Sequence, residues 1–177
     1  NQREFSWEKL QLDELWQDVI RNIRLNSKGE EFEFNEYFIG TIVLSGADSD
    51  DVLEVVDGQQ RFSVITILLS LISRILRKNG KTEFADDIFK TYIVTANQTF
   101  NRNSVNSSGE SVVEKLSKNS DREFFKRSFQ DKDEHKAAIT CDEDKKIHYA
   151  GIYLSRKLGK KALCSSLLRD GAAKYKK

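Results

Sequence analysis

The sequence lacks proline and methionine altogether and has only two cysteines among its 177 residues. Cys141 and Cys164 do not form a CxxC motif, which excludes a small disulfide scaffold and predicts reduced thiols in a cytoplasmic protein. Because no initiator methionine is present, we expect the chain to be a fragment of a longer protein that continues both upstream and downstream.

A strong net charge and a long apolar run are also absent. The net charge is only +1, so any site for phosphate has to be local. No run approaches the roughly 18 apolar residues of a membrane span, and the first residues are not a signal peptide, so we expect no membrane partner.

The two histidines, His135 and His148, are too few for a zinc site or an HNH nuclease centre, and each is expected on a surface or helix face. Walker, GxSxG and GxGxxG motifs are missing, which excludes the commonest P-loop, hydrolase and Rossmann fingerprints.

Hydrophobic periodicity predicts an α+β fold with a helical extension. Apolar residues at helical spacing indicate an amphipathic helix over residues 7–24 and a buried helix, apolar nearly all round, over residues 62–77. β-Branched and aromatic runs predict strands over residues 37–44 and 52–56, and the alternation over residues 30–35 is typical of a short strand or an extended loop. Further helices are expected over residues 83–92, 112–116, 121–129 and 145–158.

This pattern divides into three parts. We expect a compact α+β unit over residues 1–94, a mobile polar loop over residues 95–111, and a helical extension over residues 112–177 that packs on the first part.

Two acidic clusters in the sequence have simple structural interpretations. Asp48, Asp50 and Asp51 could hold a metal ion, but a solvated hairpin loop is simpler. Asp142, Glu143 and Asp144 are expected to complement the dipole of the last helix.

The motif that carries chemistry is DGQQR at residues 57–61, between a strand and the buried helix. A glycine turn that opens a helix presents free N–H groups and the positive end of the helix dipole, which attract anions. Gly58 lets the backbone approach a ligand, and Arg61 can bind a phosphate through two parallel hydrogen bonds. Gln59 and Gln60 can hold phosphate oxygens or orient a water. Asp57 can bind a metal ion or accept a proton from an attacking water.

A plainer interpretation is that Asp57 caps the helix, Gly58 makes the turn, and the other three side chains face solvent. At the start of the chain, Gln2 and Arg3 could complete a phosphate clamp with Arg61. The two motifs form one site only if residues 2–3 fold back beside residues 57–61. Phe5 and Trp7 are expected to pack on the core.

Three elements occur in order along the chain: QREFSW at residues 2–7, YFIGTIVL at residues 37–44 and VDGQQR at residues 56–61. Together they resemble the QRxYxW, YFxGxxVL and VDGQQR elements of the N-terminal domain of GmrSD-type, modification-dependent restriction endonucleases, and the resemblance spans nearly the whole chain. Two departures stand out, since Phe5 replaces the usual tyrosine and Val64 replaces a hydroxyl-bearing residue.

The resemblance implies a ParB/sulfiredoxin-like fold, in which a small mixed sheet packs on helices. It implies catalytic roles for Asp57, Gln60 and Arg61, with Asp57 as the Mg²⁺ ligand. The nucleotide- or phosphate-binding residues that it implies are Gln2, Arg3, Asp57, Gly58, Gln59, Gln60 and Arg61.

The implied function is an NTP-binding and NTP-hydrolysing sensor domain of a phage-defence system. Its partners would be a nucleoside triphosphate, modified phage DNA bound through the full-length protein, and an HNH-type nuclease domain or subunit absent from this chain. Two alternatives remain open: a non-catalytic module that binds the DNA backbone or modified DNA, and a DNA-nicking domain that uses the same loop with Asp57 as metal ligand.

Overall fold

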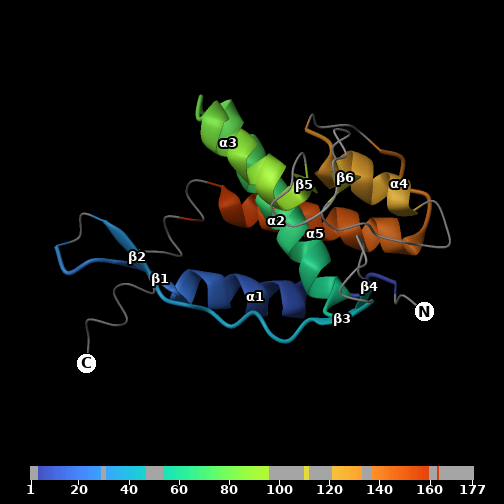
Figure 1. Cartoon of the computed structure of the whole chain (residues 1–177), viewed down its shortest axis with the longest axis horizontal. Coiled ribbons are helices and arrows are strands. Elements are labelled where there is room, and N and C mark those ends of the chain that lie inside the picture. The colour runs from blue at the N-terminus through green and yellow to red at the C-terminus, as the bar shows by residue number, and fades with distance from the viewer. Residues whose placement is uncertain are drawn as a thin grey trace.

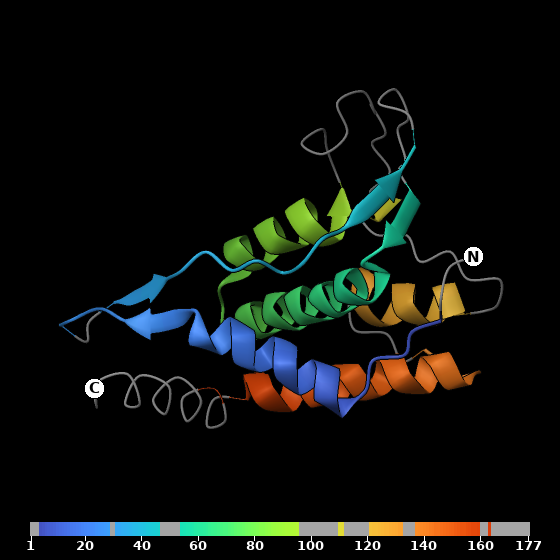
Figure 2. The same cartoon turned by 90° about the horizontal axis from the view of Figure 1, so that it is seen from below.

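The computed structural model describes residues 4–28, 31–46, 54–95, 110–111, 121–132, 137–159 and 163. Helices form its centre and short hairpins lie at its edges (Figure 1). The hairpin of β1 (Ile23–Leu25) and β2 (Phe32–Phe34) and the hairpin of β3 (Val43–Ser45) and β4 (Glu54–Asp57) lie at opposite ends of the molecule in both views (Figure 2). The α+β class predicted from the sequence is confirmed.

Helix α1 spans Lys9–Arg21 and packs Leu12, Leu15, Trp16 and Ile20 into the core. At its start, the side chain of Gln11 accepts a hydrogen bond from the Glu8 N–H at 3.0 Å, which satisfies one donor at the open end of the helix. The predicted helix over residues 7–24 was too long at both ends. Asn22 ends it, and Ile23 and Arg24 pair with a strand instead.

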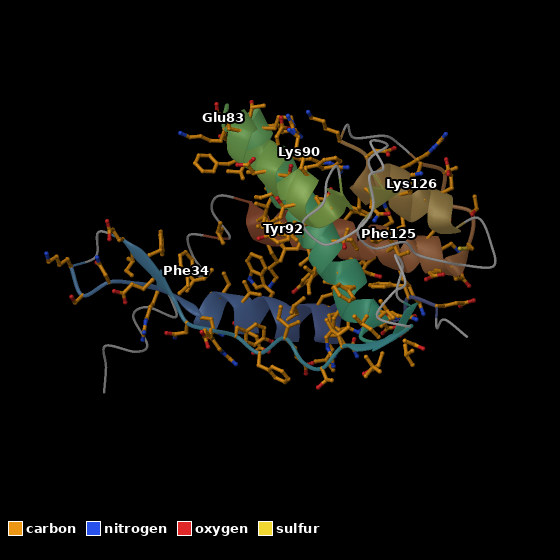
Figure 3. All side chains as sticks on the ribbon, viewed as in Figure 1. Phe34, Glu83, Lys90, Tyr92, Phe125 and Lys126 are labelled. Atoms are coloured by element: carbon orange, nitrogen blue, oxygen red, sulfur yellow. The ribbon has the colours of Figure 1, made fainter. Side chains whose placement is uncertain are left out.

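Strands β1 (Ile23–Leu25) and β2 (Phe32–Phe34) form an antiparallel hairpin. The hairpin projects beyond the helices, and Phe34, which pairs with Ile23 at the end of the hairpin nearest α1, is 74% exposed (Figure 3). Of the two structures expected over residues 30–35, a short strand or an extended loop, β2 is the short strand.

Strands β3 (Val43–Ser45) and β4 (Glu54–Asp57) form a second antiparallel hairpin with an irregular register between Val43 and Leu44. The strand predicted over residues 37–44 was wrong for residues 37–42, which pair with no described strand. In this segment the Tyr37 hydroxyl donates to Asp18 of α1, and Gly40 has a φ of 109°, which lies outside the range of a regular strand.

Helix α2 (Gln59–Lys78) is the central element and contacts α3 (Thr82–Ile88) and α5 (Asp142–Leu158). As predicted, it ends at Asn79 and Gly80. It is not apolar all round, because its buried face includes small polar side chains that let neighbouring helices approach closely. These are Ser63, Thr66, Ser70 and Ser73.

The remaining chain completes one core. Helix α3 (Thr82–Ile88) continues into a π-helical turn, η1 (Phe89–Ile93), and β5 (Val94–Thr95) pairs with β6 (Glu110–Ser111). Helix α4 (Asp121–Phe125) continues into a second π-helical turn, η2 (Lys126–Gln130). The helices predicted over residues 83–92 and 121–129 are therefore present with wider final turns, whereas residues 112–116 and most of the polar loop lie outside the described residues.

Helix α5 (Asp142–Leu158) packs against α1, α2 and α4. Its Ile147, Ala150 and Leu154 belong to the same buried cluster as Phe5 and Phe125, so the later helices share the core of the first part. Figure 3 labels Phe125 on α4, which lies beside α5. The domain limits proposed from the sequence remain predictions.

Each sheet in the described part of the chain has two antiparallel strands. The mixed sheet expected from the resemblance is therefore not present among these residues. The described strands are only two to four residues long, and helices supply most of the core in this part of the chain. No helix in the described ranges is both long and apolar enough to cross a membrane.

Candidate phosphate-binding site

The DGQQR loop, residues 57–61, turns the chain from β4 into α2. Asp57 ends the strand, and Gly58 is the N-cap of the helix, so the interpretation of Asp57 as the cap was wrong. Gly58 has a φ of 92°, and a Cβ there would stand 3.1 Å from Cγ1 of Ile42. Both the left-handed backbone and the close contact therefore favour glycine.

The amino end of α2 has two features that favour the approach of an anion. Its first turn contains no acidic residue, and no side chain among the described residues caps it. The first N–H groups of a helix have no partner within the helix, and the helix dipole makes their surroundings positive. This end of α2 therefore suits a phosphate group.

Arg61 lies in the first turn of α2 and reaches across to the segment before β3. Its Nη1 donates to the Thr41 carbonyl at 2.8 Å. Its guanidinium also contacts Gly40, where a Cβ would stand only 2.9 Å from Cζ of Arg61. The contacts with Thr41 and Gly40 hold the guanidinium in place. Because Arg61 has no carboxylate partner among the described residues, its charge stays available to an anion.

Tyr37 lies near Arg61 and is tied to α1. Its hydroxyl donates to Asp18 at 2.8 Å. Burial raises the pKa of Tyr37 above its usual range, the hydrogen bond to Asp18 raises it further, and the positive charge of Arg61 opposes both. Tyr37 and Gly40 are both specified positions of the YFxGxxVL element. This element of the sequence therefore indicated residues that surround Arg61.

Asp57 and Gln59, two further polar residues of the loop, have different surroundings. Asp57 is exposed at the end of β4, opposite Val43 of β3. Gln59 turns back on its own hairpin, since its Nε2 donates to the Val55 carbonyl at 2.6 Å. Asp57 is thus accessible to a metal ion, whereas the amide of Gln59 braces the turn.

Gln60 binds the N-terminal segment, which we define as residues 4–8. Its Oε1 accepts from the Ser6 N–H at 2.8 Å, and its Nε2 donates to the Glu4 carbonyl at 3.0 Å. One side-chain amide therefore pairs with the backbone of this segment as a neighbouring strand would. The described part of the N-terminal element therefore lies beside the loop. Gln2 and Arg3, on which the prediction of one shared site depends, lie outside the described residues, so that prediction stays untested.

Glu143 fixes the same segment from the other side. Its side chain is only 4% exposed, and Oε1 accepts from the Phe5 N–H at 2.5 Å. Phe5 is itself buried in the core, as predicted. The sequence indicated only a helix-terminal acid at this position, because nothing local reveals a partner 138 residues away.

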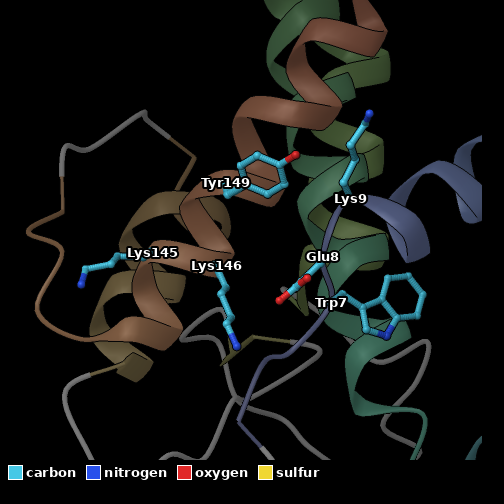
Figure 4. Close-up of a pocket in the computed structure, with 6 residues that line it drawn as sticks. All are labelled: Trp7, Glu8, Lys9, Lys145, Lys146 and Tyr149. Carbon is cyan, nitrogen blue, oxygen red and sulfur yellow. The ribbon is translucent and has the colours of Figure 1, made fainter.

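A separate groove lies between the N-terminal segment and α5, with a volume of about 330 Å³. Figure 4 shows the Glu8 carboxylate on the same side of the segment as Lys146 and Tyr149, whereas the Trp7 ring points to the opposite side. Lys9 and Lys145 complete its lining. Because its charges are mixed, this groove is a weaker candidate for phosphate than the amino end of α2.

No cluster of three or more His, Cys, Asp or Glu side chains suited to a metal occurs among the described residues. His148 is exposed and packs edge-on against Phe124, as expected for a lone helix-face histidine. His135, Cys164 and the acids Asp48, Asp50 and Asp51 lie outside the described residues.

The structure thus defines an α+β domain with an open helix end, flanked by a fixed arginine and an exposed carboxylate. The family model for the N-terminal domain of the GmrSD restriction endonuclease matches residues 1–164. The chain therefore belongs to the family of GmrSD restriction endonuclease N-terminal domains, and its role lies in a restriction system. No curated protein matches the chain.

Proposed function

We propose that this domain binds a nucleoside triphosphate at the DGQQR loop and hydrolyses it, acting as the sensor domain of a restriction system directed at modified phage DNA. The observation that carries the proposal is Arg61, which is held by Thr41 and Gly40 beside an acid-free helix end. A fixed guanidinium loses little entropy when it binds phosphate, and it offers parallel donors to two phosphate oxygens.

In this proposal, the first N–H groups of α2 and the Arg61 guanidinium bind the phosphate chain. Both place positive charge where negative charge grows during phosphoryl transfer. Gly58 lets the phosphates approach the backbone.

Asp57 fits the requirement for a Mg²⁺ ligand. Mg²⁺ is commonly held by one or two protein carboxylates together with substrate phosphates and water, and Asp57 is an exposed carboxylate at the edge of the loop. When bound, Mg²⁺ would neutralise phosphate charge. Asp57 could also orient the attacking water or accept its proton.

Gln60 enters the proposal as a residue that shapes the site. Both polar atoms of its amide already bind the N-terminal segment, so orienting a water would require at least one of these hydrogen bonds to open. The predicted catalytic role of Gln60 is therefore less direct than those of Asp57 and Arg61.

The test is to measure the thermal stability of the protein and the release of phosphate with each of the four NTPs and Mg²⁺. We expect stabilisation by at least one NTP, and its loss in Arg61→Ala. Neither stabilisation nor phosphate release with any NTP would contradict the proposal. DNA binding that weakens steeply with salt, in the absence of any nucleotide effect, would instead support the DNA-backbone module.

A further inference from the structure

We propose that Gln60 and Glu143 are positioning residues that hold the N-terminal segment against the phosphate-binding loop, so that nucleotide binding and the order of this segment are coupled. The inference rests on the proposed function, since the coupled ligand is the nucleotide bound at the same loop.

Three consecutive residues of the segment are held by two side chains from different helices. The Glu4 carbonyl and the Ser6 N–H both bind the amide of Gln60, in the first turn of α2. Between them, the Phe5 N–H binds Glu143 of α5. The segment therefore joins the start of α2 to the start of α5.

The two anchors differ in strength. The Gln60 hydrogen bonds are exposed and compete with water, whereas the Glu143 hydrogen bond is buried and involves a charged acceptor. Phe5, buried in the core, adds an apolar anchor at the same position. Glu143 and Phe5 thus hold the segment in the fold, and Gln60 sets its contact with the loop.

Gln60 takes part in both the first turn of α2 and the contact with the N-terminal segment. Its backbone lies in the helix turn that we propose binds phosphate, and its side chain lies on the N-terminal segment. A phosphate that orders this turn also orders the Gln60 side chain, and by thermodynamic linkage an ordered segment strengthens phosphate binding by the same factor.

The experiment is amide hydrogen exchange on the 177-residue chain, with and without Mg²⁺ and the NTP that stabilises it most, combined with the nucleotide affinity of each variant. In the wild type, we expect the nucleotide to slow exchange at Phe5 and Ser6. Gln60→Leu should speed exchange at Ser6 and weaken nucleotide binding by about tenfold, because both hydrogen bonds to the segment are lost.

Glu143 provides a test that a merely structural role would not pass. Glu143→Gln keeps an oxygen that can accept from the Phe5 N–H, so it should retain most of the protection at Phe5 and most of the affinity. Glu143→Leu should lose both. If Glu143→Leu fails to fold, the comparison of Gln60→Leu with Gln60→Glu still tests the anchoring of the segment. Gln60→Glu keeps the acceptor for the Ser6 N–H but sets a carboxylate against the Glu4 carbonyl.

Asp142→Asn is the matched control. It removes a charge from the same first turn of α5, but the Asp142 side chain is 86% exposed and pairs with Lys145, so exchange at Phe5 and Ser6 should not change. Unchanged protection and affinity in both Gln60→Leu and Glu143→Leu would overturn the inference. A wild-type protein that binds no NTP would overturn the proposed function and with it the coupling, whereas faster exchange at Ser6 in Gln60→Leu would still establish the anchoring.

Discussion

Gly40 and Arg61 touch so closely that a Cβ on Gly40 would stand 2.9 Å from Cζ of the guanidinium. Gly40 also has a φ of 109°, which L side chains rarely adopt. We therefore expect Gly40→Ala to push Arg61 away from Thr41. It should weaken nucleotide binding by about tenfold and lower the free energy of unfolding by about 1–2 kcal/mol. Calorimetric titration and urea unfolding measure the two effects.

Gly80→Ala separates the two causes. Gly80 also has a positive φ, of 76°, but a Cβ there meets nothing within 4 Å. This control should lose a similar amount of stability and keep the nucleotide affinity. Equal losses of affinity in both variants would mean that the contact with Arg61 is irrelevant.

Gly151, within α5, is explained by its neighbour Phe129. A Cβ at position 151 would stand 2.7 Å from Cζ of Phe129. Gly151→Ala should therefore lower the free energy of unfolding by about 1–3 kcal/mol through overpacking, although alanine is the better helix former. Combining it with Phe129→Leu should give less destabilisation than the sum of the two single variants. Strict additivity in this double-mutant cycle would argue against the contact.

Asp86 should make the free energy of unfolding depend on pH in the acidic range. A hydrogen bond from Arg77, and a second from Lys132, hold the pKa of Asp86 below its ordinary value of 3.8. Because the pKa is lower in the folded state, this contribution is present above the unfolded value and disappears as the pH falls through the folded value. Asp86→Asn should be less stable than wild type at neutral pH, and the difference should shrink below about pH 4. Urea unfolding at several pH values measures this, and a constant difference would contradict it.

Tyr37 reports directly on Arg61. Its pKa is raised mainly by burial and then by Asp18, while Arg61 lowers it. Removing the positive charge in Arg61→Ala should therefore raise the pKa of Tyr37 further, and Asp18→Asn should lower it. An ultraviolet titration, with Tyr37→Phe subtracted to isolate this residue, measures both shifts. Shifts of the opposite sign would show that Tyr37 does not sense these charges.

The sequence predicted the long helices well, because their signals are local. The apolar spacing of α2, and the Asn79 and Gly80 that end it, all lie within the helix itself. The end of α1 was missed because Ile23 continues the helical spacing but pairs with Phe34 across a hairpin. Tertiary pairing overrode a correct local pattern.

The local structure of the proposed site was predicted from its motif: the loop follows β4, Gly58 makes the turn, and Arg61 lies in the first turn of α2. The roles of these residues in binding stay predictions. The contacts of Gln60 and Glu143 could not be predicted, since each partner is distant in the sequence. Even so, the expected meeting of the N-terminal element with the loop is consistent with the pairing of Gln60 and the backbone around Phe5.

The most direct test of the account is the affinity of Mg²⁺–NTP for the wild-type protein and for Arg61→Ala, measured by calorimetric titration. Arg21→Ala serves as the control, since it removes an exposed arginine on α1 that pairs with Asp18. The account predicts that Arg61→Ala weakens binding at least about tenfold, as expected for the loss of a charge-assisted phosphate contact, while Arg21→Ala leaves it within about twofold. Equal affinities of the wild-type and Arg61→Ala proteins would contradict it.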